Sequence, residues 1–216
     1  MSTLPSIETL SRVTEALLGP PFEWCQVTGG NVTLEDASRS GGTPGGVYQI
    51  AEFAISKYPI TNARYQKFLN DPLGYIDSQW WEFSAEATQW RKDHRRPRPT
   101  AFGGADLPRT RVSWFESVAF CSWLSAKLKT VFVEGCVRLP TEHEWQRAAI
   151  GDTSWPYPWG EHLSETFGNY GGQIGHPTRV GHYRDSKSPY GVLDMVGNVW
   201  EWCLTAWGAD DKDVGG

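Results

Sequence analysis

The stretch from Asp152 to Cys203 constrains this chain most, because it is long and has almost no helical or strand periodicity. It is rich in glycine, proline and aromatic residues, and it ends in the sequence GVLDMVGNVWEWC. Long segments without regular structure are uncommon in compact domains unless function or a physical tie holds them in place. A bound ion is one such tie. We therefore expect a fold in which this stretch is anchored rather than folded into helices or strands.

The composition favours the same kind of fold. The 216 residues include 12 Trp, 23 Gly and 14 Pro. Large aromatic rings fill the space between irregular segments, and glycine and proline mark turns. The composition therefore predicts a compact fold with many turns and few long helices.

Charge, hydropathy and cysteine usage exclude several function classes. The net charge is −5, which argues against nonspecific nucleic-acid binding. No apolar run is long enough to span a bilayer, and the N-terminus lacks the basic and apolar regions of a signal peptide. The four cysteines show no CxxC spacing, which predicts reduced thiols. We expect a cytoplasmic protein that binds neither nucleic acid nor membrane.

One basic cluster stands out in this acidic chain. The sequence RKDHRRPRP covers residues 91–99 and contains two prolines and one aspartate. A charge run of this kind is usually a solvated loop, and the alternative is a surface that docks a partner. The sequence leaves both interpretations open.

Local patterns in the first third of the chain predict one helix followed by strands. Apolar spacing predicts a helix over residues 6–18, capped by Ser6 and ended by Gly19. Two β-prone runs flank the Gly29-Gly30 pair, which predicts a hairpin turn at these glycines. Residues 38–46 read as a flexible loop, and strand character resumes at residue 47.

Further along, capping signals mark three helices. Thr61 can cap a short helix over 61–71, and capping boxes formed by Ser113 with Glu116 and by Thr141 with Glu144 open two more. These two helices are predicted over residues 113–129 and from 141 to about 149. Residues 71–112 are predicted to be a long irregular insertion, and residues 136–140 a buried strand.

Several motifs together resemble the formylglycine-generating enzyme, or sulfatase-modifying factor, family. They occur in order as ISKYPITNARYQKF, PRTRVSWFESVAFCSWL, VRLPTEHEWQRAA, YPWG, GNYGG and PYGVLDMVGNVWEWC. The resemblance covers roughly residues 22–207, and RLPTEHEW and GNVWEW are its specific markers. It implies an α+β, loop-rich fold related to the C-type lectin domain, with few short helices and a small antiparallel sheet. It divides the chain into an N-terminal helical appendage, 1–20, and a family domain, 21–216.

The resemblance implies a calcium site in the closing stretch. The ligands would be the side chains of Asp194 and Glu201 and the carbonyl groups of Gly197 and Val199. Calcium takes six to eight oxygens in forgiving geometry, which suits such a mixed set. The tryptophans at positions 200, 202 and 207 would pack around the loop and exclude water. The competing interpretation is that the two carboxylates pair with arginine or cap backbone.

A second calcium site of the family is expected to be incomplete. Its first ligands would be the Asn169 side chain and the Tyr170 carbonyl. The family then supplies an acidic side chain, whereas the sequence GGQIGHPTRV that follows contains no Asp or Glu.

Catalysis by the family depends on residues that do not match here. Formylglycine generation uses copper held by two cysteines beyond the WEW segment, and none of the four cysteines corresponds to them. Cys203 is expected to be a packed thiol, and Cys121 and Cys136 to lie in the core. The iron-dependent relatives take their ligands from an additional helical domain, and the five histidines show no HExxH spacing. We therefore expect no copper in this chain.

Two functions remain open at this stage. In the first, the chain is a non-catalytic, calcium-stabilised scaffold that binds a protein or small-molecule ligand. In the second, it is part of an oxidoreductase of the family, or a related non-haem metal oxidase, whose catalytic cysteines lie in a further C-terminal segment. The sequence GADDKDVGG at the end resembles the family's linker, so the fold is expected to lack its final strands.

Overall fold

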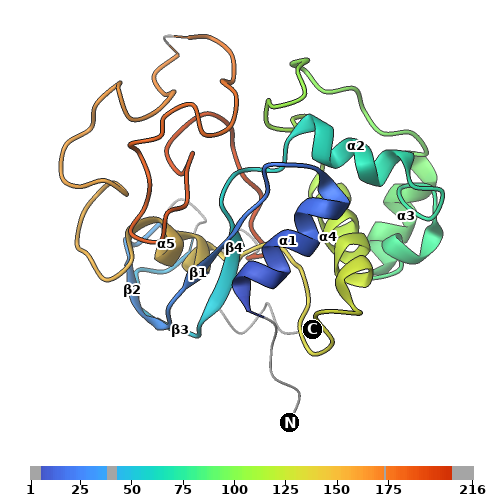
Figure 1. Ribbon diagram of the computed structural model, residues 1–216, viewed down its shortest axis with the longest axis horizontal. Helices are drawn as coiled ribbons and strands as arrows, with labels where there is room; N and C mark the ends of the chain where they lie inside the picture. Colours follow the sequence, from blue (N-terminus) through green and yellow to red (C-terminus); the bar gives the residue numbers. More distant parts are fainter. Residues whose placement is uncertain (1–5, 38–42, 173, 206–216) are drawn as a thin grey trace. The chain divides into compact units, whose positions relative to one another are not determined.

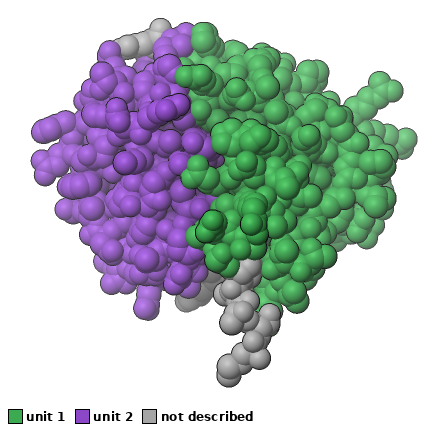
Figure 2. All heavy atoms as spheres, in the orientation of Figure 1, with its two compact units in different colours: residues 1–23, 59–139, 176–180 green, residues 24–58, 140–175, 181–216 purple. Residues whose placement is uncertain are grey.

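The computed structural model describes residues 6–37, 43–172 and 174–205. The chain divides into two compact units, each assembled from separated segments (Figure 2). The first unit comprises residues 1–23, 59–139 and 176–180, and the second comprises residues 24–58, 140–175 and 181–216. Part of the predicted loop at 38–46, Trp207 and the linker-like end lie outside the described residues.

Four short strands of the second unit form one interrupted antiparallel ribbon (Figure 1). β1 (Trp24–Val27) pairs with β4 (Phe53–Ser56), and β2 (Gly30–Leu34) pairs with β3 (Gly46–Ile50). The register is continuous from one pair of strands to the next. Val27 faces Phe53, and Gly30, three residues after Val27, faces Ile50, three residues before Phe53. The strands occur where the sequence predicts them, but the predicted turn at Gly29-Gly30 is wrong. The chain runs straight through these glycines and reverses only after Leu34.

The break in the ribbon is filled by Arg147 of α5 (Glu142–Ile150). Its guanidinium group donates hydrogen bonds to the carbonyl oxygens of Thr28 at 3.2 Å, Gly29 at 3.3 Å and Asn31 at 3.0 Å. A Cβ atom on Gly30 would lie 2.5 Å from one guanidinium nitrogen, so glycine leaves the room that the arginine needs. This close approach explains Gly30, one of the two glycines that resembled a hairpin turn.

The hydrophobic core of the second unit lies between α5, the ribbon and the irregular stretch. α5 begins at the predicted capping box, with Thr141 and Glu144 in their expected roles. Its last turn packs against apolar residues of the strands and of the stretch near Asp194. The buried members of this cluster are Cys25, Val27, Val32, Ala148, Ala149, Ile150, Val192 and Met195.

The first unit is mainly helical. α1 (Ile7–Leu18), α2 (Asn62–Asn70) and α4 (Trp114–Leu128) each begin after the predicted caps, Ser6, Thr61 and Ser113. α1 and α4 both contact α2. Buried rings from α2, α4 and the segment between them pack in stacked and edge-to-face pairs, which stabilise aromatic cores beyond simple burial. These rings belong to Tyr65, Phe68, Tyr75, Trp81, Phe120 and Trp123.

Two sequence predictions in this unit need correction. Residues 71–112 are not wholly irregular, because they contain a 3₁₀ helix, η2 (Ser78–Trp81), and the helix α3 (Ala85–Asp93). α3 buries only Ala87 completely, so it lacks the apolar periodicity by which a helix is recognised. Residues 136–140 do not form a strand, and Cys136 is exposed rather than part of the core.

The stretch from Asp152 to Cys203 contains no helix or strand among its described residues, as its sequence predicts. Isolated bridges, such as the one between Asn169 and Gly197, hold it together. None of the helices in the described part of the chain has the length and hydrophobicity needed to cross a lipid bilayer.

Candidate functional site

Asp194 is the buried carboxylate of the candidate site. The residue is 6% exposed and has a left-handed backbone, with φ of 62°, which is uncommon outside glycine. Its Oδ2 atom accepts a hydrogen bond from the backbone N–H of Gly181 at 2.6 Å. Burial raises the pKa of Asp194, while this hydrogen bond and the nearby His182 lower it. The net rise shows that the negative charge is incompletely compensated.

Glu201 lies close enough to Asp194 for the two charges to interact. Packing around the carboxyl group and the charge of Asp194 raise the pKa of Glu201 to about 7, although the Trp145 hydrogen bond opposes this rise. That bond runs from the indole Nε1 of Trp145 in α5 to the Oε2 atom of Glu201, at 3.2 Å. The residue as a whole is exposed, so water still reaches this end of the site.

The backbone segments of the two expected calcium sites lie side by side. Asn169 forms a parallel bridge with Gly197, and its carbonyl accepts a hydrogen bond from the Asn198 N–H at 2.8 Å. A Cβ atom on Gly197 would lie 2.3 Å from the carbonyl oxygen of Asn169. The Gly197 carbonyl accepts a hydrogen bond from the Val199 N–H at 2.8 Å. The structure thus brings the segment that contains Asn169 and Tyr170 against the segment between the two carboxylates.

These groups provide part of what a calcium ion requires. Within the described residues, each carboxylate accepts one hydrogen bond through one oxygen, which leaves the other oxygen for a cation. The backbone carbonyl of Gly197 has a second lone pair beyond the hydrogen bond that it accepts from Val199. A hard divalent cation accepts such a mixture of carboxylate and carbonyl oxygens. Among the described residues, no cluster of three or more His, Cys, Asp or Glu side chains could hold a metal. A cation here would therefore depend on backbone oxygens and water as well as on the two carboxylates.

The tryptophans do not enclose the site as expected. Trp200 is 103% exposed and Trp202 is 51% exposed, while Trp207 lies outside the described residues. The indole that contacts a carboxylate is instead that of Trp145, which comes from α5. Sequence reasoning missed Trp145, Gly181 and His182, because all three are distant in sequence from the carboxylates they approach.

None of the four cysteines forms a disulfide within the described residues. Cys25 is buried and Cys136 is exposed. Burial raises the pKa of Cys121 to about 12, and burial with nearby carboxylates raises the pKa of Cys203 to the same value. A thiol with such a pKa stays protonated at neutral pH and is a poor nucleophile and metal ligand.

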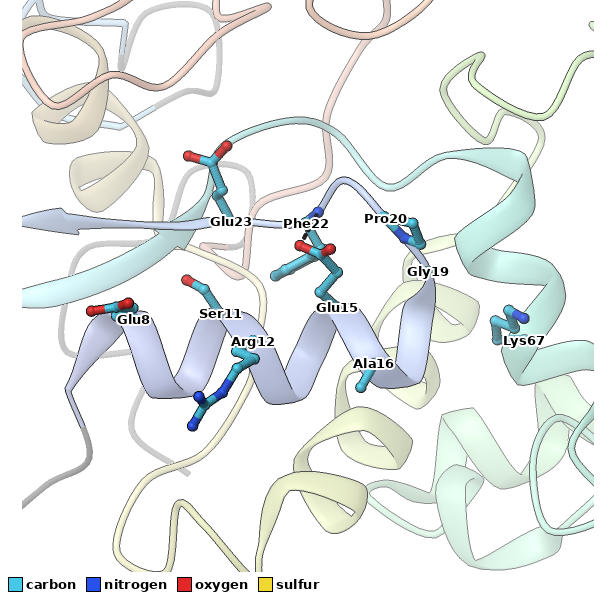
Figure 3. Close-up of a pocket in the computed structure, with 10 residues that line it drawn as sticks. All are labelled: Glu8, Ser11, Arg12, Glu15, Ala16, Gly19, Pro20, Phe22, Glu23 and Lys67. Atoms are coloured by element: carbon cyan, nitrogen blue, oxygen red, sulfur yellow. Dashed lines mark hydrogen bonds between the residues drawn. The ribbon is translucent and has the colours of Figure 1, made fainter.

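A shallow pocket lies in the first unit, away from these carboxylates in sequence. Its volume is about 590 Å³, and α1, the segment after it and Lys67 of α2 line it (Figure 3). Glu15 accepts a hydrogen bond from the Phe22 N–H at 3.3 Å inside this pocket, which ties α1 to the following segment. The pocket contains acidic and basic side chains but no arrangement typical of a catalytic site.

Comparisons with known proteins agree on one family. The model of the sulfatase-modifying factor enzyme 1-like domain matches residues 17–214. The hercynine oxygenase of Mycobacterium tuberculosis is 34% identical over 195 residues, which are 82% of this chain and 43% of that protein. The inactive C-alpha-formylglycine-generating enzyme 2 of Bos taurus is 28% identical, covering 99% of this chain and 82% of that protein. The chain thus spans less than half the length of the hercynine oxygenase it matches.

The fold is also found among solved structures. Treponema denticola variable protein 1 has a TM-score of 0.59 at 21% sequence identity, covering 87% of this chain and 74% of that chain. CarF has a TM-score of 0.52 at 21% identity, covering 85% and 80%. These likenesses confirm the expected α+β, loop-rich fold of C-type lectin-like type.

Proposed function

The chain belongs to the family of sulfatase-modifying factor enzyme 1-like domains, and we propose that it acts as a calcium-stabilised scaffold that binds a ligand. Its ligand is a protein or a small molecule. Bound calcium holds the irregular stretch, residues 152–203, in the conformation that binds this ligand. In this proposal the chain itself carries out no formylglycine chemistry.

The observation that carries the proposal is the pair of carboxylates, Asp194 and Glu201. The pKa of each is raised, and the charge of Asp194 contributes to the rise at Glu201. A buried carboxylate with a second carboxylate nearby disfavours the folded state unless a proton or a cation neutralises the charge. A divalent cation would remove this cost and tie together two segments that have no regular structure.

Two further features favour binding over chemistry. The thiols of Cys121 and Cys203 have pKa values near 12, which does not suit a copper site built from thiolates. The relative from Bos taurus, whose name marks it as inactive, matches 99% of this chain. A domain of this family can therefore persist without the family's catalytic activity.

One observation favours a second function, namely the 34% identity with hercynine oxygenase. Under this alternative the chain is one part of a metal-dependent oxygenase. The described residues provide no side-chain cluster for a catalytic metal, so the ligands would come from polypeptide outside them. The chain would then help to bind and orient the substrate.

Calcium titration tests the first function. We expect isothermal titration calorimetry to detect calcium binding, and EDTA to lower the melting temperature. The variant Asp194→Asn with Glu201→Gln should abolish both effects. The exposed pair Asp185→Asn with Glu161→Gln removes the same charge from the same unit and should leave both unchanged. A melting temperature that is identical with calcium and with EDTA would exclude the calcium-stabilised scaffold.

Product analysis distinguishes the second function. The chain would be incubated with a cysteine-containing sulfatase peptide and copper, and separately with hercynine, ferrous iron and oxygen. The scaffold proposal expects mass spectrometry to show neither peptide nor hercynine converted. Conversion in either reaction would favour the oxidoreductase.

A further inference from the structure

The basic cluster at 91–99 becomes part of a larger charged surface in the fold. Residues 91–111 contain seven Arg and Lys side chains and two acidic ones, in a chain whose net charge is −5. Arg91 and Lys92 belong to the last turn of α3, and the other five lie in the connection between α3 and α4, whose course is seen in Figure 1. The net charge of the chain outside residues 91–111 is therefore more negative than that of the whole chain. Both ends of this connection belong to the first unit.

Hydrogen bonds made by side chains bring the two halves of this connection together. Arg109 donates a hydrogen bond from its guanidinium group to the carbonyl of Arg98. The Thr110 hydroxyl contacts the Thr100 hydroxyl at 3.1 Å and accepts a hydrogen bond from the Ala101 N–H at 3.2 Å. Residues 98–101 and 109–110 thus lie side by side, which places Arg98 and Arg111 on neighbouring segments of the connection.

The far half of the connection is in turn fixed to α2. The Asn62 N–H donates to the Leu107 carbonyl at 2.9 Å, and the Ala63 N–H donates to the Ala105 carbonyl at 3.0 Å. These bonds satisfy two backbone donors at the start of the helix, which would otherwise lack partners. The connection is therefore held in one conformation rather than free in solvent.

The arginines of this region fall into two groups. Arg91 and Arg109 lie against the aromatic core, over the rings of Tyr75 and Tyr65 at 4.8 and 4.9 Å. A second group is exposed and projects its charge into solvent, and we call it the arginine surface. It consists of Arg95, Arg96, Arg98 and Arg111.

The arginine surface has features of a binding site rather than of a solvated loop. Pro97 and Pro99 restrict the backbone beside Arg96 and Arg98, which lowers the entropy lost when a partner orders them. Arg111 adopts a left-handed backbone with φ of 57°. Such a conformation costs free energy in a residue with a side chain and is found preferentially at functional sites.

Few acidic groups compete for these arginines. Asp93 accepts a hydrogen bond from Gln89 at 3.1 Å on α3, and Asp106 is the other carboxylate of the connection. Neither forms an ion pair with the arginine surface within the part of the chain that the structure describes. The guanidinium groups are thus available for carboxylates from another molecule, to which they can bind in a bidentate manner.

We propose that the arginine surface is a docking site for an acidic protein segment, rich in Asp and Glu. The surface consists of arginines, whose planar guanidinium groups match planar carboxylates. Its small extent suits a short segment. A long polyanion such as nucleic acid would also meet the net negative charge of the remaining chain, which opposes its binding.

A peptide-binding experiment tests the proposal. Fluorescence anisotropy would measure binding of a labelled poly-glutamate peptide, with a single-stranded oligonucleotide of equal length as the competing ligand class. We expect the peptide to bind at low salt and its affinity to fall as salt rises. Replacing Arg95, Arg96, Arg98 and Arg111 by Gln should weaken binding at least about tenfold, since exposed ion pairs are individually weak but act together here.

Matched variants keep the result interpretable. Replacing Arg12, Lys67, Lys129 and Arg138 by Gln removes the same number of positive charges, four, from exposed positions of the same unit outside the connection. This variant should retain most of the affinity. Equal losses in both variants, or no binding of the peptide at low salt, would overturn the proposal. Tighter binding of the oligonucleotide than of the peptide would also overturn it and identify nucleic acid as the ligand class.

Discussion

Replacing Arg147 by Met should destabilise the second unit severely. The arginine side chain is 1% exposed and fills the break in the β ribbon, where it hydrogen-bonds the carbonyls of Thr28, Gly29 and Asn31. Methionine preserves most of the apolar packing of the side chain but donates no hydrogen bond. The substitution therefore isolates the contribution of the guanidinium group.

The magnitude follows from the bonds that are lost. A hydrogen bond to a charged group contributes about 1.5–3 kcal/mol, and an unsatisfied buried carbonyl costs about 1–3 kcal/mol. Because Thr28, Gly29 and Asn31 are themselves exposed, water can reach part of the vacated space and recover some of this energy. We expect the free energy of unfolding to fall by about 3 kcal/mol. This is a large share of the total of about 5–15 kcal/mol that is typical of folded proteins.

Urea denaturation, followed by tryptophan fluorescence, measures this loss. The matched control is Asp152→Asn, which removes the other partner of Arg147. The Asp152 side chain is 77% exposed, so the control should change stability little even though its carboxylate lies 2.6 Å from the guanidinium group. Gly30→Ala should destabilise through the same site, because its Cβ would displace the guanidinium group. A loss below about 0.5 kcal/mol for Arg147→Met, the range of ordinary surface substitutions, would refute this reasoning.

Three further predictions concern the candidate site and the thiols. Gly197→Ala should lower the melting temperature more than Gly171→Ala, because both have a positive φ but only the former would push a Cβ against a neighbouring carbonyl; equal losses would contradict this. With calcium chelated, the contribution of Glu201 to stability should be fully present below the pKa of an unfolded Glu and should be lost as pH rises to about 7, because the folded state raises the pKa of Glu201 and so favours its protonated form. Thermal melts across this range should show the decline, and Glu201→Gln should reduce it. Iodoacetamide should alkylate the exposed Cys136 before Cys121, because burial raises the pKa of Cys121 to about 12. Peptide mass mapping would measure the order of alkylation, and the reverse order would contradict this prediction.

Local signals predicted most helices because each carries its own cap. Thr61, Ser113 and Thr141 accept the hydrogen bonds that their positions in the sequence suggest. α3 also has a capping serine, Ser84, but its polar composition hides it. Trp90 of α3 stacks on Trp81, with the ring centroids 5.6 Å apart. A helix held by such aromatic contacts has no apolar periodicity that the sequence would reveal.

Strand pairing could not be predicted in the same way, since it depends on distant residues. A Gly-Gly pair between two β-prone runs is a good hairpin signal. In the structure Gly30 makes room for Arg147, which lies more than a hundred residues further along the chain. The glycines are informative only when that arginine is known to approach them.

Only part of the candidate site could be predicted from the sequence, for a similar reason. The resemblance identified Asp194 and Glu201, and the structure places their charges within reach of each other. It could not identify the donors that hold them, because Gly181 and Trp145 belong to other segments. The exposure of Trp200 likewise depends on what surrounds it, which composition does not specify.

The break in the ribbon also sets an order of events during synthesis on the ribosome. β2 and β3 are close in sequence and can pair as soon as both have emerged, since local contacts form fastest. The carbonyls at the break must wait for an arginine that lies 116 to 119 residues further along the chain. In the nascent protein these carbonyls therefore remain without their guanidinium donors until α5 has emerged.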